Sequence, residues 1–397
     1  MTSSSLFAAL AEPARRAPKS GIVEVFNYGR GREGLIPLWV GEGDLPTPGF
    51  IADAASAALA GGETFYTWQA GVPELRAALA RYHARLYGVP EDHTRFYVTV
   101  GGMQAIQISI RLVAGAGDEV IVPTPAWPNF AAAAGVGGAR PVQVPMGFGN
   151  DGWTPDIERL EAAVTSRTRA ILVNSPSNPT GWVASLDDLK NLLALARRHG
   201  LWIIADEVYG RFVYAGGRAP SFHDVADPED RILYTNTFSK NWAMTGWRMG
   251  WIEADPSLGP TIESLIQYST SGVPPFLQRG AVAAVEQGDP FITHQIERAA
   301  ASRAALVEAL SATGRVRYAE PAGAFYLFVA IDGMPDTRAL ALRLVDEALV
   351  GVAPGTAFGA GGEGFLRLCY LREPAQVAEA GARLAGWIER ASIARIS

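Results

Sequence analysis

The chain has 397 residues, with 34 lysines and arginines, 40 acidic residues and a formal net charge of −6. Hydrophobic residues make up 48% and charged residues 19%, so the chain can bury a sizeable core. Its length suggests about two or three domains. The acidic balance, without a basic block, argues against bulk binding of nucleic acid. The single cysteine, Cys369, excludes an internal disulfide framework and CxxC-type metal sites, which fits a reducing cytoplasm.

The first 20 residues do not read as a signal peptide. The apolar run at residues 6–10 is short, and Arg15, Arg16 and Lys19 follow it where a cleavage site would lie. No apolar run approaches the roughly 20 residues that span a bilayer. We therefore expect a soluble, cytoplasmic protein with a short, irregular leading segment.

Strand-like and helix-like stretches alternate through the middle of the chain. The pattern predicts strands at residues 96–100, 119–122, 170–173, 202–205 and 232–234. It predicts helices at residues 103–113 and between Ser185 and Gly200, where Ser185 and Asp188 form a capping box and Gly200 suits the C-terminal cap. Short apolar strands separated by helices indicate a mostly parallel central sheet sandwiched by helices, the α/β class.

The pattern changes after about residue 290. A long helical stretch at 291–313 is followed by strands at 325–329 and 366–370 and by a final helix at 374–391. This mixture predicts a second, smaller α+β domain formed by both chain ends. We place the large domain at residues 47–288 and the small domain at residues 1–46 together with 289–397.

The residues that follow the predicted strands carry the candidate chemistry, because ligands of such folds bind at the carboxyl ends of strands. Gly101 and Gly102 open a helix and suit an anion, although an ordinary tight turn explains them as well. Trp127 lies in a proline-framed loop and is either a core anchor or a stacking surface for a flat ligand. Asn178, in the loop after residue 173, most simply caps its own turn.

Acidic and basic residues follow the next two strands. Asp206 and Glu207 come directly after one strand; a magnesium-binding strand of a P-loop ATPase looks similar but needs a GxxxxGK[ST] motif, which is missing. Of the three lysines, Lys190 lies on a solvated helix face and Lys19 in the leading segment. Lys240 instead follows a hydroxyl-rich strand end, where a lysine is either a salt-bridge partner or a reactive amine.

Taken together, these strand ends suit one ligand. A phosphate cradle, an aromatic surface, an amide, an acid, a tyrosine, a lysine and an arginine are what pyridoxal phosphate requires. The chain resembles the fold-type I, class I/II aminotransferases of the aspartate aminotransferase superfamily, from about Gly21 to Trp387. The motifs appear in family order: Gly41-Glu42-Gly43-Asp44, Tyr66 before Gly71, Gly101-Gly102-Met103, Trp127-Pro128-Asn129, Asn178-Pro179-Thr180-Gly181, Asp206-Glu207-Val208-Tyr209, Ser239-Lys240, Gly246-Trp247-Arg248-Met249-Gly250 and Arg367.

The resemblance implies a role for each matched residue. Lys240 is implied as the catalytic amine that forms the internal aldimine with pyridoxal 5'-phosphate and moves the α-proton. Asp206 is implied as the partner of the ring nitrogen, Asn178 and Tyr209 as partners of the phenolic oxygen, and Trp127 as the residue that stacks on the ring. The remaining implied positions are Gly101, Gly102, Met103, Thr237 and Arg248 at the phosphate, Tyr66 at the phosphate of a partner subunit, and Arg367 with Gly41, Trp127 and Asn178 at the substrate carboxylate.

The implied function is transfer of an α-amino group from an L-amino acid to a 2-oxo acid by a ping-pong mechanism, in a homodimer with shared active sites. Two matched positions depart from the pattern: Thr237 replaces a serine but keeps the hydroxyl, and Gly43 replaces a proline. An aspartate-specific branch carries a lysine at the position of Met103, so we expect apolar or aromatic substrates. An aspartate-specific enzyme, with a partner-subunit arginine supplying the charge, and a C–S β-lyase remain the alternatives.

Other classes find less support in the sequence. Residues 359–364 match GxGxxG but open into a strand-like segment instead of a helix. A GxSxG hydrolase motif is missing, and the five histidines lack HExxH spacing, so we expect no metal site. A pyridoxal-phosphate-sensing regulator would need a DNA-binding module, and the first 45 or so residues carry no helix-turn-helix pattern.

Overall fold

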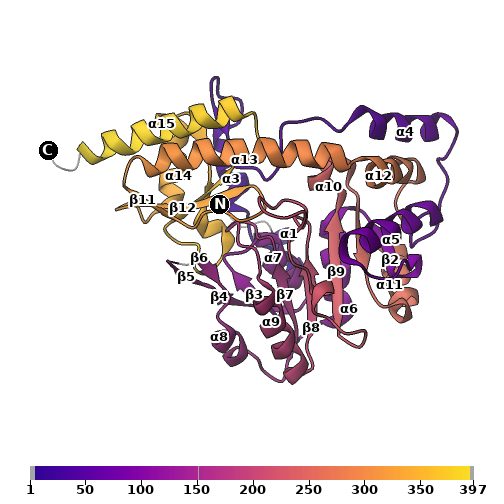
Figure 1. Cartoon of the computed structure of the whole chain (residues 1–397). Coiled ribbons are helices and arrows are strands. Elements are labelled where there is room, and N and C mark those ends of the chain that lie inside the picture. The colour runs from indigo at the N-terminus through magenta and orange to yellow at the C-terminus, as the bar shows by residue number, and fades with distance from the viewer. Residues whose placement is uncertain (1–4, 151, 394–397) are drawn as a thin grey trace.

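The computed structural model describes residues 5–150 and 152–393, and its largest element is a seven-stranded mixed sheet (Figure 1). The strands are β2 (Phe96–Thr99), β3 (Glu119–Thr124), β4 (Arg140–Pro145), β7 (Thr168–Asn174), β8 (Trp202–Asp206), β9 (Ile232–Thr237) and β10 (Gly250–Glu253). Their order is β2-β10-β9-β8-β7-β3-β4. From β4 to β9 all neighbours are parallel, while β10 is antiparallel to both β2 and β9.

The expectation of a mostly parallel sheet is confirmed, and every strand predicted in the middle of the chain is present. Strand β10 was not predicted. All four of its residues are buried, so the segment lacks the alternation of polar and apolar residues that marks a half-exposed strand. Strands β8 and β9 also extend further than predicted, to Asp206 and Thr237, because their polar ends still pair in the sheet.

Helices cover both faces of this sheet, as predicted. On one face, α8 (Ile157–Ala162) and α9 (Leu186–His199) pack on Ile171 and Val173. On the other, α6 (Gly101–Val113) and α7 (Pro128–Val136) pack on Ala170 and Leu172. Successive strand residues point to opposite faces, so a single apolar run in β7 serves both layers.

The helix boundaries follow from local chemistry. Ser185 and Asp188 form the predicted capping box at the start of α9, and Gly200 closes the helix with a φ of 64°. Helix α6 begins at Gly101, two residues before the predicted start. Gly101 has a φ of +72°, and a Cβ there would lie 2.6 Å from Nη2 of Arg248, so glycine is required.

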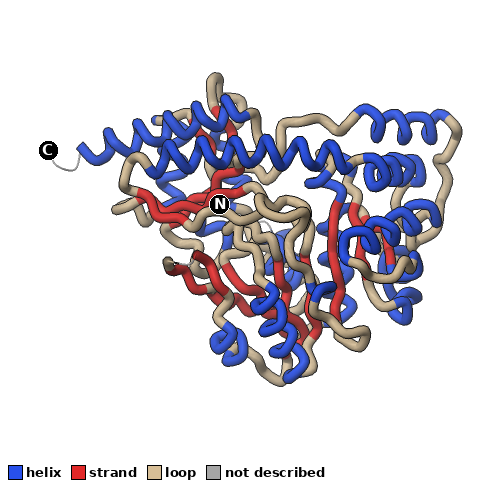
Figure 2. The backbone as a smooth tube through the Cα atoms, viewed as in Figure 1, coloured by secondary structure: helices blue, strands red, loops and turns tan. Residues whose placement is uncertain are grey.

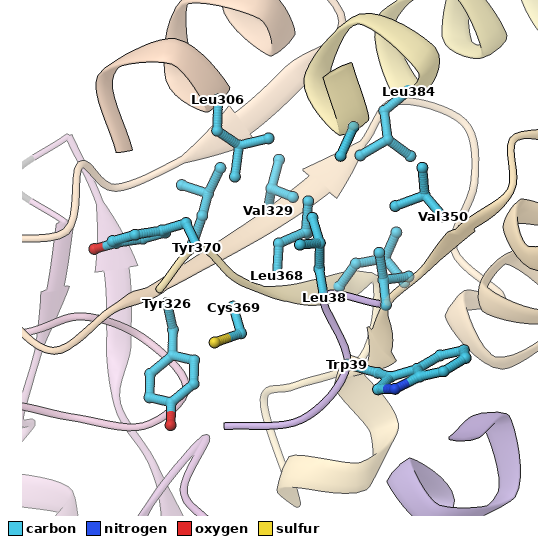
Figure 3. Packing of buried hydrophobic residues seen from close by; sticks show 14 of the residues in the cluster. Leu38, Trp39, Leu306, Tyr326, Val329, Val350, Leu368, Cys369, Tyr370 and Leu384 are labelled. Carbon is cyan, nitrogen blue, oxygen red and sulfur yellow. The ribbon is translucent and has the colours of Figure 1, made fainter. Parts of the chain in front are cut away.

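A second, four-stranded antiparallel sheet is built mainly from the C-terminal part of the chain. Its strands are β11 (Val316–Tyr318), β12 (Tyr326–Ile331), β15 (Phe365–Cys369) and β14 (Ala353–Pro354), in that order. The helices are α13 (Asp289–Ser311), α14 (Thr337–Glu347) and α15 (Pro374–Ile393); α13 and α15 lie side by side (Figure 1). Figure 3 shows Leu306 and Leu384 from these two helices converging on Val329 and Leu368, while the Tyr326 hydroxyl points away from this aliphatic cluster.

Residues near the N-terminus pack beside the second sheet and form a separate two-stranded sheet with a C-terminal strand. Helix α3 (Gly21–Gly29) places Val25 in the same core, and β1 (Ile36–Pro37) pairs in parallel with β13 (Val350–Gly351). Residues 359–364 connect the 3₁₀ turn η5 (Gly355–Phe358) to β15, so the GxGxxG match lacks the helix that a dinucleotide site requires.

The remaining helices pack at the other end of the large sheet, near β2 and β10 (Figure 2). They are α4 (Gly49–Ala60), α5 (Pro73–Tyr87), α10 (Phe238–Asn241), α11 (Gly259–Gln267) and α12 (Pro275–Gln287), and a hairpin of β5 (Gly147–Gly149) and β6 (Gly152–Thr154) lies apart from them. The leading segment, expected to be irregular, contains two short helices, α1 (Ser5–Ala8) and α2 (Glu12–Arg15), while residues 1–4 lie outside the described part. Within the described ranges, no helix combines the length and apolar character needed to cross a membrane.

Candidate active site

A cavity of about 560 Å³ lies between the carboxyl ends of the large sheet's parallel strands and the second sheet. Residues that follow β3, β7, β8 and β9 line one side, and α3, β12 and β15 line the other. The cavity brings together most of the residues selected from the sequence: Gly41, Gly102, Met103, Trp127, Asn178, Asp206, Tyr209, Thr237, Lys240, Arg248 and Arg367. The strand-end rule accounts for this convergence, since the carboxyl ends of parallel strands meet at one edge.

Lys240 projects into the cavity from α10, directly after β9. Its Nζ donates a hydrogen bond of 2.7 Å to the carbonyl oxygen of Gly41. Burial lowers the pKa of Lys240 to about 8, and the cationic Arg367 and Arg248 act in the same direction. A neutral amine is therefore available close to physiological pH, which a lysine nucleophile or base requires.

Asp206 ends the neighbouring strand β8 and is almost fully buried. Val208 N and Asn174 Nδ2 both donate to its Oδ1, each at 3.3 Å. Burial raises the pKa of Asp206 to about 7, and the charge of Glu207 adds to the shift. The carboxylate forms no salt bridge with any described residue, so a cationic ring nitrogen in the cavity would be a fitting partner.

An anion-binding corner forms where α6 begins. Arg248, with a φ of 54°, is held by a 2.7 Å hydrogen bond from its Nη1 to the carbonyl oxygen of Thr245. Its guanidinium lies against Gly101, and Gly250 allows close approach because a Cβ there would come within 2.8 Å of Gly102 N. A helix N-terminus beside a guanidinium is a ready anion site.

Arg367 provides a second anion site on β15, at the other side of the cavity. Its side chain is buried and its Nη1 donates to Asn178 Oδ1 at 3.0 Å, while Nη2 donates to the carbonyl oxygen of Trp39. The guanidinium lies between the rings of Tyr326 and Phe358, 4.7 and 5.0 Å from their centres. Its Nε is buried without a hydrogen-bond partner in the described structure, so a carboxylate bound at two points would satisfy it.

Two polar residues of the cavity were missed from the sequence. The Tyr326 hydroxyl lies 2.8 Å from that of Tyr209, and a Cβ at Gly41 would come within 2.3 Å of it. Nothing in the apolar run of β12 distinguishes Tyr326 from a core residue. Asn174 could have been found, because it ends β7 directly opposite Asp206 in the sheet register.

Part of the cavity lining is apolar. Helix α3 contributes Ile22, Val23 and Phe26, and Met103 and Phe130 add to the same lining. Among the described residues that line the cavity, the only cationic side chains are those of Lys240, Arg248 and Arg367.

Two selected residues, Tyr66 and Gly101, do not line the cavity. The side chain of Tyr66 is 94% exposed, and Phe65, Trp68 and Tyr268 are also strongly exposed. Gly101 does not line the cavity itself but supports Arg248 from behind. Tyr66 therefore has no role in the active site of its own chain in this structure.

Comparison with known proteins agrees with this geometry. The family model described as aminotransferase class I and II matches residues 33–384. An aspartate aminotransferase from Pyrococcus horikoshii is 33% identical over 378 residues, 94% of this chain and 96% of the relative. An aromatic-amino-acid aminotransferase from Thermococcus litoralis is 33% identical over 380 residues, 95% and 97% of the two chains. The solved structure of an aspartate aminotransferase from Thermotoga maritima superposes with a TM-score of 0.90 at 31% identity, covering 96% of this chain and all of that one (100%).

The lowered pKa of Lys240 can be measured directly in protein stripped of small ligands. Reductive ¹³C-methylation labels the three lysines and the N-terminal amine, and NMR then follows each dimethylamine against pH. Beside the signal of the N-terminal amine, we expect one lysine signal with a midpoint near pH 8, because burial disfavours the ammonium form of Lys240. That signal should vanish in Lys240→Arg and persist in Lys190→Arg; a midpoint near 10.5 for Lys240 would contradict the geometry.

Proposed function

This chain belongs to the class I and II aminotransferases, which are pyridoxal-phosphate-dependent transaminases. We propose that it binds pyridoxal 5'-phosphate covalently at Lys240. In this proposal it moves an α-amino group from an L-amino acid to a 2-oxo acid by a ping-pong mechanism. When bound, the cofactor supplies an aldehyde and an electron-accepting ring. The observation that carries the proposal is the convergence on one cavity of a buried amine with a pKa of about 8, an unpaired buried carboxylate and two separate anion sites.

The residues around the ring position divide the work of holding it. Asp206 faces the ring nitrogen, and its negative charge keeps a proton there. Asn178 uses Oδ1 to accept from Arg367, which leaves its Nδ2 free to donate to a phenolic oxygen. Tyr209 donates to the same oxygen, with Tyr326 fixing its hydroxyl. Trp127, at the start of α7, stacks on the ring face.

The two anion sites bind the cofactor phosphate and the substrate α-carboxylate. The backbone N–H groups of Gly101, Gly102 and Met103, with Thr237 and Arg248, hold the phosphate. Arg367 binds the substrate α-carboxylate, assisted by the backbone near Gly41 and by Trp127 and Asn178. Lys240 then takes the proton from the substrate Cα, because its Nζ can be neutral near pH 8.

The transferase proposal is tested at Lys240. Borohydride treatment of the yellow purified protein should fix the cofactor, and peptide mapping should place it on Lys240. Lys240→Arg should lower kcat by at least about a thousandfold, since both covalent attachment and proton transfer are lost.

Kinetics separate the transferase from other chemistry on the same scaffold. Double-reciprocal plots for donor and acceptor should be parallel, as a ping-pong mechanism requires. Lys190→Gln is the matched control and should keep wild-type rates. Label on Lys19 or Lys190, or pyruvate and ammonia released from cystathionine without an amino acceptor, would refute the assignment.

We further infer a preference for apolar or aromatic amino acids. Met103 and the α3 residues Ile22, Val23 and Phe26 offer a substrate side chain an apolar surface. The three cations that line the cavity are already assigned to cofactor and α-carboxylate, so among the described residues none remains for a second carboxylate. Relatives of nearly equal identity are named for aspartate and for aromatic amino acids, so their names do not decide between the two.

A panel of amino donors tests this preference. Tyrosine, phenylalanine or leucine should exceed aspartate in kcat/KM by about tenfold or more, the value of burying a large side chain in place of an uncompensated charge. Met103→Lys should reduce the difference between the donors by raising kcat/KM with aspartate. Val136→Lys, at an exposed position of α7 that does not line the cavity, should not. Aspartate leading by a wide margin in the wild type would exclude the preference.

The exposed aromatic residues suggest a homodimer. Phe65, Tyr66, Trp68 and Tyr268 are each at least 62% exposed, which is costly for a monomer in water. We propose that they meet a second copy of the chain, with Tyr66 reaching the partner's phosphate. The proposed large domain, residues 47–288, carries all four, and residues 1–46 with 289–397 form the proposed small domain.

Sedimentation at micromolar concentration should therefore give a species of twice the 42.3 kDa chain mass. Tyr268→Glu should shift the protein toward monomer and reduce activity in parallel, because a buried unpaired carboxylate is costly. Val136→Glu, an exposed apolar position in α7, serves as the control. A fully active monomer would contradict the shared site.

A further inference from the structure

A chain of buried polar groups leads away from Asp206 on the far side of β8. Glu207 follows Asp206 directly, is 7% exposed and has both carboxylate oxygens close to Ser221 Oγ, at 2.8 and 2.9 Å. Ser221 Oγ in turn lies 2.8 Å from His223 Nδ1. The other ring nitrogen, Nε2, lies 2.9 Å from Glu253 Oε2. Four side chains thus connect the end of β8 to the end of β10.

Counting protons assigns the charge on His223. Ser221 has one hydroxyl proton, and Glu207, with both oxygens around that hydroxyl, is an acceptor for it. His223 Nδ1 must then donate to Ser221 Oγ. Nε2 must also donate, because it faces a carboxylate at 2.9 Å. In the arrangement with an ionised Glu207, both nitrogens carry protons and His223 is an imidazolium between two carboxylates; a protonated Glu207 would instead leave His223 neutral.

The surroundings support this charge. The His223 ring is stacked between the rings of Tyr87 and Tyr234, at 4.4 and 3.9 Å between centres. Burial opposes a charge on His223, but the adjacent Glu253 raises the pKa of His223 above its ordinary value. For Glu253 burial acts upward, yet His223 and His83 hold its pKa well below the usual range.

The other charged groups around His223 leave the cluster nearly neutral. Arg95 Nε lies 3.2 Å from Glu253 Oε1. Arg218 lies over the Tyr87 ring and pairs with Asp224. His83 Nδ1 is 2.8 Å from Glu253 Oε2, and burial lowers the pKa of His83, which favours its neutral form. The positive charges of His223 and Arg95 thus balance the negative charges of Glu207 and Glu253.

The same residues could suggest a metal site, since donor atoms of His83, His223 and Glu253 lie within 4.8 Å of one another. The tautomer of His83 argues against it. Trp251 Nε1–H donates to His83 Nε2 at 3.3 Å, so Nε2 is unprotonated. A neutral imidazole that bound a metal through Nδ1 would carry its proton on Nε2, facing that donor. The cluster is therefore a hydrogen-bonded charge network.

We propose that Glu207, Ser221, His223 and Glu253 form a charge relay behind β8 that positions Asp206 and sets the charge next to its carboxylate. The relay residues are positioning residues, and their effect on the reaction rests on the proposed function, in which Asp206 faces the ring nitrogen. The ionised Glu207, one residue away in a low-dielectric interior, disfavours a second negative charge at Asp206. Burial raises the pKa of Glu207, and a positive charge on His223 opposes that shift.

The relay also ties the two central strand ends together. Phe222 N donates to Glu207 Oε1 at 3.2 Å, and Asn236 Nδ2 donates to the Glu207 carbonyl oxygen at 3.3 Å. Asn236 belongs to β9, which leads into Lys240. The backbone of Glu207 is thus tied to the strand that leads to the reactive amine, and its carboxylate is tied to the segment that carries Ser221 and His223.

The charge on His223 is tested without any ligand. The chain has five histidines, so imidazole ¹⁵N NMR of the full-length protein resolves each one, and His223→Gln assigns the signal. We expect His223 to stay doubly protonated to a higher pH than an ordinary histidine does. Glu253→Gln should lower the pKa of His223, since a facing negative charge is removed. A wild-type His223 that titrates at or below the ordinary histidine value would overturn the relay.

The coupling to Asp206 is tested by ¹³C NMR of labelled aspartate carboxyl groups, with Asp206→Asn as assignment. Glu207→Gln should lower the Asp206 midpoint from about 7 by about one unit, because the neighbouring negative charge is gone. Ser221→Ala breaks the link without removing a charge and should shift both Asp206 and His223. Glu119→Gln, a buried carboxylate at the start of β3, is the control for burying an amide and should shift neither.

An unchanged Asp206 midpoint in Glu207→Gln would refute the coupling. In the holoenzyme, Glu207→Gln should likewise lower the pH at which the absorption of the bound cofactor changes. Failure to bind pyridoxal phosphate would instead refute the proposed function, while both NMR titrations would still report on the relay.

Discussion

The burial of opposite charges at the ends of two adjacent strands is the constraint on which the rest of this structure depends. Asp206 ends β8 and Lys240 follows β9, and both are removed from water. Burial pushes each toward its neutral form, so that one becomes a carboxylate of high proton affinity and the other an amine of low proton affinity. Neither side chain forms a salt bridge among the described residues. A ligand with complementary charged groups would compensate both of them.

Arg367 imposes the same constraint on the second sheet. A buried guanidinium needs acceptors, and it finds them in Asn178 from the large sheet and in the carbonyl of Trp39. The cavity therefore requires both parts of the fold, since one part carries the amine and the acid and the other carries the carboxylate-binding group. The long helix α13 and its neighbour α15 supply the apolar packing that holds β12 and β15 in place (Figure 3). This packing thereby positions Arg367 at the cavity.

The sequence predicts most of the cavity because the strand-end rule and motif order act locally. Lys240, Asp206 and Asn178 each follow an apolar run that any reader of the sequence can find. The residues that were missed depend on contacts between distant segments. The role of Tyr326 depends on its hydrogen bond to Tyr209, which lies 117 positions away in the sequence. Strand β10 is defined by its pairing with two neighbouring strands. Pairing of this kind leaves no periodicity in the chain.

The relay behind β8 illustrates the same limit with a physical reason. His223 looks in the sequence like one of five scattered histidines, because its partners Glu207 and Glu253 are 15 or more positions away and approach it only in the folded sheet. A buried network of three ionisable groups and a hydroxyl is destabilising unless each charge is compensated. Replacing it with apolar residues of similar volume is often neutral or stabilising in other proteins, so stability alone does not explain its presence. The network begins at the residue next to Asp206. In our proposal its function is to set how strongly the Asp206 carboxylate holds a proton, and this function explains why a destabilising network is kept.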